Sequence, residues 1–289
     1  MRYSTRRLHS RSASALPPAG ATPSQRRLLH MGTARLTGAA LLTALALFAF
    51  VTPVFHEADP ARQNLLATLT PPGSEALLGT DHLGRSMLSR MSAAMRLSLG
   101  LSLASVATAL IPGVLLGVIA GWRGGRTDRW LGVLADTFLA LPGLLLVLLL
   151  VAIAPGSFLA LYMGISLVLW IEYFRFARAV TAVTLHSPQI EASRLLGFGR
   201  RYCFYRHLWP ALLPGVATLA AFGAASAILA VAALGFVSVG VSPPTAELGM
   251  MVTELFPWIF DAPWLIAQPV LAITLMVLGF HLLAGEPRA

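Results

Sequence analysis

The side chains of this chain that could carry out chemistry are few and far apart. Its 289 residues include 12 Asp and Glu, 7 His and a single Cys. The patterns GxxxxGK[ST] of a P-loop, HExxH of a zinc protease and GxSxG of a hydrolase elbow are all missing from the sequence. Asp81 and His82 are neighbours, but a metal site needs further ligands. We therefore expect no catalytic centre, no metal site and no cofactor bound by this chain.

The residues that attract attention instead form a charged loop, EASRLLGFGRRYCFYRHLWP, at 191–210. Ser187 followed by Pro188 is typical of a helix start, because serine caps free amides and proline has no amide to leave unpaired. Gly197 suits the left-handed position that ends a helix, and Phe198 beyond it can pack back on the last turn. A second helical piece is expected to end at Pro210. Such a short amphipathic helix fits either a groove on a partner protein or the surface of an anionic membrane.

The composition predicts the elements that must position this loop. Hydrophobic residues make up 56% of the chain and charged residues only 11%, with a mean hydropathy of +0.74. A soluble domain would carry about 25% charged residues. This is the composition of an all-α polytopic membrane protein. The net charge of +9 is explained by loops on the cytoplasmic side, so we expect no nucleic-acid partner. The single Cys203 excludes an internal disulfide.

Apolar runs of about 20 residues predict membrane-spanning helices. There are six such runs, at 33–54, 97–120, 131–153, 159–180, 211–237 and 264–284. They divide the chain into a disordered basic tail (1–32), a first span (33–54), a periplasmic segment (55–96), a core (97–285) that contains the loop 181–210, and a short tail (286–289). Met1 and Met31 both fit as the first residue of the protein.

The distribution of arginine predicts the orientation of these spans. Short loops on the cytoplasmic side of a membrane carry an excess of positive charge. Arg outnumbers Asp and Glu before the first span, in 122–129 and in 172–207, whereas acids prevail in 56–90 and 238–263. The bias alternates from loop to loop. We therefore expect both termini, and the loop at 191–210, to lie in the cytoplasm.

Several motifs in this chain resemble a known family. The spacing Glu191-Ala192-Ser193, Gly197 and Pro210 is similar to the EAA loop of bacterial ABC importer permeases, with Ser193 in place of the usual second Ala. LGTDHLGRSMLSR, GWRGGRTD, LADTFLALPGLLL, ALGFVSVGVSPPTAELGMM and the last span follow in the order found in C-type permeases of the dipeptide, oligopeptide and nickel family. Ser86 stands where that family usually has Asp. The matches cover about residues 75–285.

The resemblance implies a type I ABC importer permease fold in the bacterial inner membrane. It implies a pore shared with a homologous B-type permease, two ATPase subunits that bind ATP and Mg, an extracytoplasmic solute-binding protein and surrounding lipid. The chain itself would not be an enzyme. A di- or oligopeptide is the first expectation for the cargo, and nickel or a metal–chelator complex is the second. An ion-gradient secondary transporter remains the alternative of another class, although such a protein needs inverted repeats and several intramembrane acids.

The resemblance also assigns individual residues. In the family the EAA loop is a helix that docks on the ATPase, which implies the coupling residues Ile190, Glu191, Ala192, Ser193, Leu196, Gly197, Phe198, Arg200, Arg201 and Pro210. Glu191 is interpreted first as orienting the two helices of its own loop, and second as pairing with the ATPase. Asp136 and Glu172 are candidates for the pore, because acids inside a membrane are costly. The spacing of Glu172 and Arg175 also predicts an ordinary intrahelical ion pair.

Overall fold

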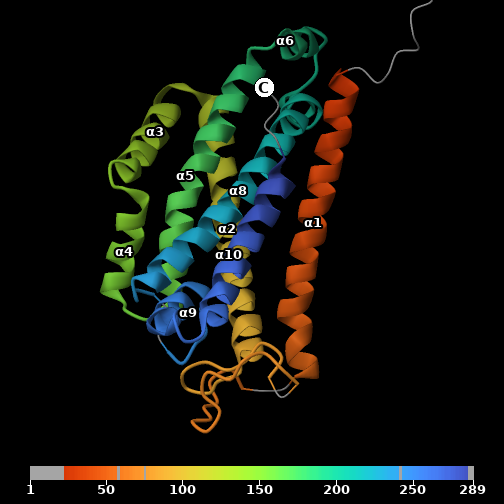
Figure 1. The fold of residues 1–289 in the computed structure, drawn as a ribbon. Coiled ribbons are helices and arrows are strands. Elements are labelled where there is room, and N and C mark those ends of the chain that lie inside the picture. The colour runs from red at the N-terminus through yellow and green to blue at the C-terminus, as the bar shows by residue number, and fades with distance from the viewer. Residues whose placement is uncertain (1–22, 57–58, 75, 241–242, 286–289) are drawn as a thin grey trace, which may run out of the picture.

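The computed structural model describes residues 23–56, 59–74, 76–240 and 243–285, and it is an elongated bundle of helices (Figure 1). Among these residues the extended pairing is limited to one isolated bridge between Thr80 and Ser86. The helices are α1 (Pro23–Phe55), α2 (Met87–Arg123), α3 (Gly125–Leu139), α4 (Gly143–Ile153), α5 (Phe158–Leu185), α6 (Pro188–Leu195), α7 (Arg200–Cys203), α8 (Trp209–Phe236), α9 (Leu248–Leu255) and α10 (Pro263–Ala284), with a π-helix at Phe204–Leu208 and a 3-10 turn at Phe256–Trp258.

The predicted all-α membrane fold is confirmed. Five helical segments are long and apolar enough to span a bilayer, at 32–55, 87–123, 158–185, 200–236 and 263–284. Each one overlaps a predicted span. The first helix begins at Pro23, so residues 23–32 are helical where a disordered tail was expected. The rest of that tail, the residues before Pro23, lies outside the described residues.

The predicted span at 131–153 is wrong as a single helix. It is divided into α3 and α4, which meet at an angle of 76° across 140–142. Pro142 explains the break, because proline has no amide to donate and disfavours a helical conformation at the residue before it. Pro142 has φ −55° and ψ 130° and stands immediately before α4. The pair makes a sixth span only if both helices are counted together.

The most extensive helix packing among the described residues joins α2 to α5, and it includes a line of glycines. A Cβ placed on Gly113, Gly117 or Gly121 would lie 2.6, 2.4 or 2.7 Å from a backbone oxygen of α5. Glycines spaced four residues apart allow this approach, because in a membrane helices associate through close backbone packing. The two backbones are therefore in direct contact over about two helical turns.

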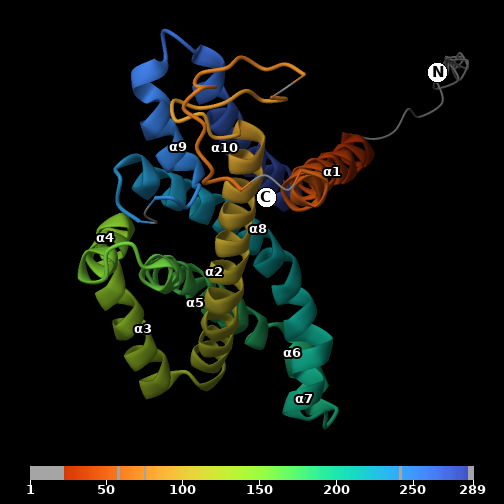
Figure 2. The same ribbon diagram turned by 90° about the horizontal axis from the view of Figure 1, so that it is seen from below.

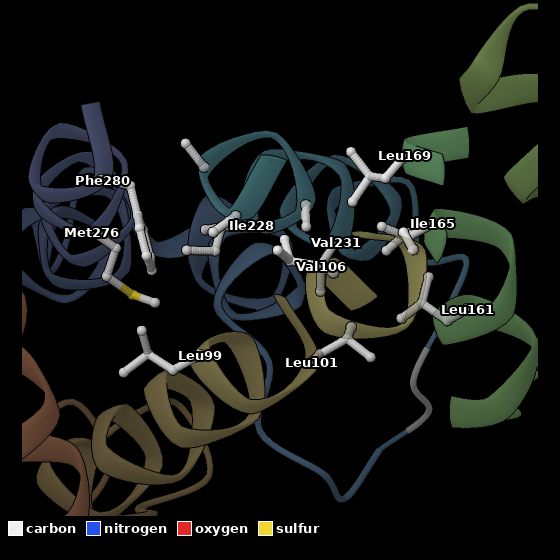
Figure 3. Packing of buried hydrophobic residues seen from close by; sticks show 14 of the residues in the cluster. Leu99, Leu101, Val106, Leu161, Ile165, Leu169, Ile228, Val231, Met276 and Phe280 are labelled. Atoms are coloured by element: carbon white, nitrogen blue, oxygen red, sulfur yellow. The ribbon is translucent and has the colours of Figure 1, made fainter. Parts of the chain in front are cut away.

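The core of the bundle lies between α2, α5, α8 and α10. Figure 3 shows buried side chains from these four helices interdigitating, among them Leu101, Ile165, Ile228 and Met276. Many large apolar side chains on the outside, such as Leu115 at 58% exposure, face away from this core. That outer surface is suited to the hydrocarbon of a bilayer, because exposing apolar side chains to lipid tails carries no free-energy cost.

The bundle has two ends with different contents. In Figure 1, α6 and α7 lie at one end, called here the α6 end, and α9 lies with residues 59–74 and 76–86 at the other, the α9 end. Figure 2 shows α3 and α4 beside α5, with α1 on the opposite side of the bundle, against α10 and α2. The charged loop identified from the sequence is thus held away from the acidic loops.

Candidate functional site

The loop at the α6 end begins with the predicted short helix, although without the predicted cap. Pro188 occupies the first turn of α6, as expected. Ser187 stands at the N-cap in an extended conformation, but its side chain makes no capping hydrogen bond. The start of α6 therefore depends on the proline, whose missing amide needs no partner.

The end of α6 is the glycine stop that the sequence predicts. Gly197 has φ +84°, in the left-handed region. Its amide donates to the Arg194 carbonyl at 3.0 Å, and the Phe198 amide donates to the Ser193 carbonyl at 3.0 Å. These two bonds satisfy carbonyls that the last helical turn leaves open. The Phe198 ring goes on to stack on Tyr202, with centroids 4.2 Å apart.

The second helical piece does not end at Pro210, which corrects the sequence prediction. The chain is helical from Arg200 to Phe236, through α7, the π-helix and α8. The π-turn carries the chain past the proline, because the Trp209 amide bonds to the Phe204 carbonyl five residues back. Pro210 lies in the first turn of α8, where its missing amide costs little.

Buried side chains fasten α6 to the rest of the molecule. Ile190 has 0% exposure and Ser193 has 8%. The Ser193 hydroxyl donates to the Gln189 carbonyl and contacts His207 Nε2 at 2.9 Å. His207 is in the π-helix that leads into α8. A side-chain hydrogen bond thus connects α6 to the start of a spanning segment, and the hydroxyl that makes it is the departure from the EAA pattern noted in the sequence.

The end of α6 and the residues just after it expose an apolar surface, called here the apolar face of α6, beside the exposed polar side chains of Gln189, Glu191 and Arg194. Leu195 is 84% exposed, Leu196 is 76% exposed and Phe198 is 44% exposed. Leu195 is absent from the residues assigned from the sequence. The assigned Ile190 and Ser193 are buried, so they position the helix and cannot contact a partner. An exposed pair of leucines at the end of a short helix fits either a groove on a partner protein or the surface of a membrane.

The structure shows no contact through which Glu191 would orient the two helices of its own loop, so that role stays a prediction. Glu191 and Ala192 are exposed, and the Glu191 carboxylate makes no hydrogen bond or ion pair with any residue that the structure describes. Arg200 and Arg201 are exposed as well, on the four-residue helix α7. These three charges are available for contacts outside the chain.

The two candidates for the pore lie on different helices. Glu172 of α5 lines a cavity of about 130 Å³ between α4, α5 and α8, where apolar side chains and Ser226 complete the wall. Its predicted ion pair with Arg175 is absent, because the Arg175 Nη2 instead faces Asp136 of α3 at 3.9 Å. Asp136 and Arg175 are 68% and 60% exposed, so this contact between helices is loose.

A tighter link between α3 and α5 was missed by the sequence reasoning. Arg178 contacts both carboxylate oxygens of Asp128, through Nε to Oδ1 and through Nη2 to Oδ2 at 2.7 Å. Two parallel bonds of this kind fix an arginine and a carboxylate in one geometry. The sequence signal for this ion pair was Asp128 in GWRGGRTD, the one acid in a segment that contains two arginines.

At the α9 end the structure reveals a buried ionic cluster. Asp81 has 0% exposure and accepts hydrogen bonds from Arg85 Nε at 2.6 Å and from Arg90 Nη1. Both arginines also donate to Glu254 Oε2, at 2.8 and 2.6 Å. Two positive and two negative charges therefore balance. Burial alone would raise the pKa of Asp81, yet the Arg85 amide and the charges of Arg90 and Arg85 hold it below its usual range.

This cluster explains the LGTDHLGRSMLSR motif, since Asp81, Arg85 and Arg90 are its charged residues. It fastens residues 79–86 and the start of α2 to α9, which carries Glu254. His82 stacks on Trp258 instead, with ring centroids 6.2 Å apart. No three metal-ligating side chains come together in the described parts of the chain.

Comparisons with known proteins agree with this arrangement. A profile of the family described as binding-protein-dependent transport system inner membrane component matches residues 113–285. A di/tripeptide transport system permease protein of Pseudomonas aeruginosa is 39% identical over 86% of this chain and 83% of its own length. The nickel transport system permease protein NikC of Escherichia coli K12 is 33% identical over 86% of this chain and 90% of its own.

A likeness to a solved structure shows the fold. A chain of the MetNI methionine ABC transporter in an inward-facing conformation superposes with a TM-score of 0.51 and 18% identity. The match covers 65% of this chain and 92% of the other. The superposition shows that the two chains share a fold over the matched part.

Proposed function

This chain belongs to the binding-protein-dependent transport system inner membrane component family, as a multi-pass permease subunit of the inner membrane, and on that premise we propose that it imports di- or oligopeptides. It forms the translocation pore together with a homologous B-type permease. Two ATPase subunits bind at the α6 end, and a solute-binding protein delivers cargo at the α9 end. The chain catalyses nothing, and ATP and Mg are held by the ATPases.

The observation that carries this proposal is the exposed apolar face of α6. Leu195 at the end of α6, with Leu196 and Phe198 just after it, is exposed, whereas Ile190 and Ser193 of the same helix are buried. α6 follows α5 after two residues and connects through His207 to α8. When the ATPases close on ATP, α6 moves with them, and both helices move with α6. The spans then open toward the solute-binding protein, and ATP hydrolysis returns the spans to their starting arrangement.

The charges support the same orientation. Arg123, Arg194, Arg200 and Arg201 lie at the α6 end, whereas Glu247, Glu254 and Asp261 lie at the α9 end. Positive charge marks the cytoplasmic side of a membrane protein. We therefore assign the α6 end, the N-terminus and the C-terminus to the cytoplasm.

Affinity purification of the chain from its native membrane tests the assembly. A second permease and one or two ATPases should co-purify in a mild detergent. A chain that leaves the membrane alone in several mild detergents would contradict the proposal, and would favour a lipid-bound α6 and an ion-gradient transporter.

Nickel is the second candidate for the cargo, because NikC matches this chain over 90% of its own length. The two candidates are separated by uptake assays with the purified complex in proteoliposomes. ATP-dependent accumulation of a labelled dipeptide that excess nickel does not inhibit supports peptide import. Accumulation of nickel that a dipeptide does not inhibit would reverse the assignment.

The bond between Ser193 and His207 should transmit motion from α6 to α8. His207→Ala removes a side-chain hydrogen bond worth about 1 kcal/mol. We expect peptide uptake per ATP hydrolysed to fall several-fold while ATPase co-purification stays unchanged. The measurement is uptake and ATP hydrolysis in the same proteoliposomes.

His186→Ala is the matched control, because His186 bonds only to the Ala182 carbonyl of its own helix. Ser193→Ala should produce the same loss as His207→Ala, and combining the two should add nothing further. Additive losses would show that the two side chains act separately, and an unchanged ratio would remove the pair from the coupling route.

Glu172 is expected to contact the cargo or the water around it. Glu172→Gln keeps the shape of the side chain and removes the charge from the small cavity between α4, α5 and α8. We expect dipeptide uptake to fall about tenfold, since a hydrogen bond to a charged group contributes about 1.5–3 kcal/mol. Asp136→Asn should have a smaller effect, because the Asp136 carboxylate already faces Arg175 Nη2 at 3.9 Å. Equal uptake by wild type and Glu172→Gln would exclude this acid from the route.

A further inference from the structure

The α6 end contains a pocket that the coupling role leaves unexplained. It has a volume of about 640 Å³ and lies between the last turn of α2 and the loop that joins α6 to α7. Trp122 and Arg123 come from α2, Arg194 from α6 and Arg200 from α7, with residues 197–199 between them. The pocket is therefore assembled from the end of α2 and from the α6–α7 segment, which lies about 70 residues further along the chain.

The charge in this pocket has one sign. Arg123, Arg194 and Arg200 line it, and no Asp or Glu does. None of these three guanidinium groups has an ion pair or a hydrogen bond with the residues of the described ranges. Arginine is the side chain best suited to phosphate, because its planar group donates two parallel hydrogen bonds. Three such groups around one pocket favour a phosphate as the ligand.

An apolar groove adjoins the pocket. It has a volume of about 390 Å³ and shares Trp122, Arg123 and Arg200 with the pocket. Its remaining wall consists of Arg201 and of apolar or aromatic side chains, Val118, Ile119, Phe204 and Tyr205. The Trp122 and Phe204 rings meet there, with centroids 6.4 Å apart. A free phosphate ion would make no use of such a surface, whereas a molecule with a phosphate and a hydrocarbon chain would.

The pocket and the groove lie at the depth where spans end. Arg123 is the last residue of the spanning segment 87–123, and Arg200 is the first of 200–236. The groove follows α2 from Arg123 back toward the middle of the bilayer, through Ile119 and Val118. Trp and Arg at this depth are typical of a membrane–water interface. Phospholipid headgroups occupy the same depth.

We propose that this pocket and groove bind one anionic phospholipid. The phosphate lies among Arg123, Arg194 and Arg200, and an acyl chain lies along Ile119, Phe204 and Tyr205. Basic pockets at the ends of spanning helices recognise anionic headgroups. Because the ligand would contact both α2 and the loop beside α6, it would hold that loop at the membrane surface. The proposal depends on neither the cargo nor the ATPases.

The test is native mass spectrometry of the full chain, purified with its partners and stripped of lipid in a neutral detergent. Phosphatidylglycerol and phosphatidylcholine with identical acyl chains are titrated separately. We expect one phosphatidylglycerol per chain to bind at least tenfold more tightly than phosphatidylcholine. Arg123→Gln and Arg200→Gln should each weaken that binding about tenfold, the loss expected for a hydrogen bond between charged groups.

Matched controls come from the same end of the chain. Arg126→Gln and Arg129→Gln remove exposed arginines of α3 that line neither hollow, so they should leave lipid binding unchanged. Ile119→Gln should weaken phosphatidylglycerol binding through the groove. Glycerol phosphate, which has no acyl chain, should not compete at equal concentration.

Three outcomes would overturn the proposal. Equal losses in the α3 controls would show that only overall positive charge matters. Competition by glycerol phosphate at equal concentration would show that the groove takes no part and that the ligand is a soluble phosphate. Retained lipid with reduced ATPase co-purification, in Arg123→Gln and Arg200→Gln, would show that the pocket holds an acidic segment of the ATPase instead.

Discussion

Peptide uptake should be abolished by the double variant Leu195→Asp, Leu196→Asp, while the chain still inserts in the membrane. Both side chains are more than three quarters exposed in the isolated chain, so charge at these positions does not disturb the fold. In the proposed assembly the ATPase covers them, and each buried leucine contributes about 1.5–3 kcal/mol. Two buried carboxylates would add a further desolvation cost. Retention of the ATPases on the tagged chain and uptake of a labelled dipeptide measure the effect.

Leu65→Asp, Leu66→Asp is the matched control, because it changes an adjacent pair of exposed leucines in the segment 59–74 near the α9 end. The control should keep its ATPases. If the α6 variant also keeps them and transports normally, the apolar face of α6 is not the docking surface. The lipid-bound interpretation of α6 would then replace the proposed one.

The second large effect concerns stability. Asp81→Asn removes one negative charge from the cluster of Asp81, Arg85, Arg90 and Glu254, and leaves two buried arginines with Glu254 as their one remaining carboxylate. Removing one partner of a buried ion pair costs about 3–5 kcal/mol. We expect a large fall in the melting temperature of the purified chain and poor recovery from the membrane. Thermal unfolding in detergent, followed by light scattering or intrinsic fluorescence, measures this fall.

Two further variants make the test specific. Asp261→Asn removes an exposed acid near the same end of the bundle and should leave the melting temperature unchanged. Asp81→Asn combined with Arg85→Gln restores neutrality, because Arg90 and Glu254 remain paired at 2.6 Å. This double variant should be more stable than Asp81→Asn alone. A double variant that is no more stable would show that charge balance is not what the cluster provides.

The sequence predicts most of the fold because membrane spans depend on length and composition. Five of the predicted spans match single helical segments to within about ten residues at each end. The third does not, because hydropathy measures how apolar a segment is and says nothing of its direction. Pro142 was the local signal for the break between α3 and α4. The glycines at 113, 117 and 121 were a visible signal for close packing, but the partner helix could not be read from them.

In the α6 loop, the features that depend only on local backbone geometry could be predicted from the sequence. Gly197 ends α6 because a left-handed residue is needed there, and that requirement is local. The role of Glu191 stays a prediction, because its partner depends on how the chain and its neighbours fold around the loop. The ionic cluster was missed for the same reason, since Asp81 and Glu254 are far apart in sequence. The resemblance to a known family predicted the subunits of the importer, whereas the exposure of Leu195 added that residue to the proposed contact surface.

The glycine contact between α2 and α5 has a mechanical consequence for the importer. Where the two backbones touch, no side chains lie between them that could re-pack. We therefore expect α2 and α5 to move together as one rigid unit. Because α6 follows α5 after two residues, a movement of α6 is passed directly to the end of α5. Residues 140–142, where α3 and α4 meet at 76°, are not held in one continuous helix, so we expect bending to occur there. We therefore expect the conformational change in each transport cycle to occur mainly at 140–142, while α2 and α5 move as one rigid unit.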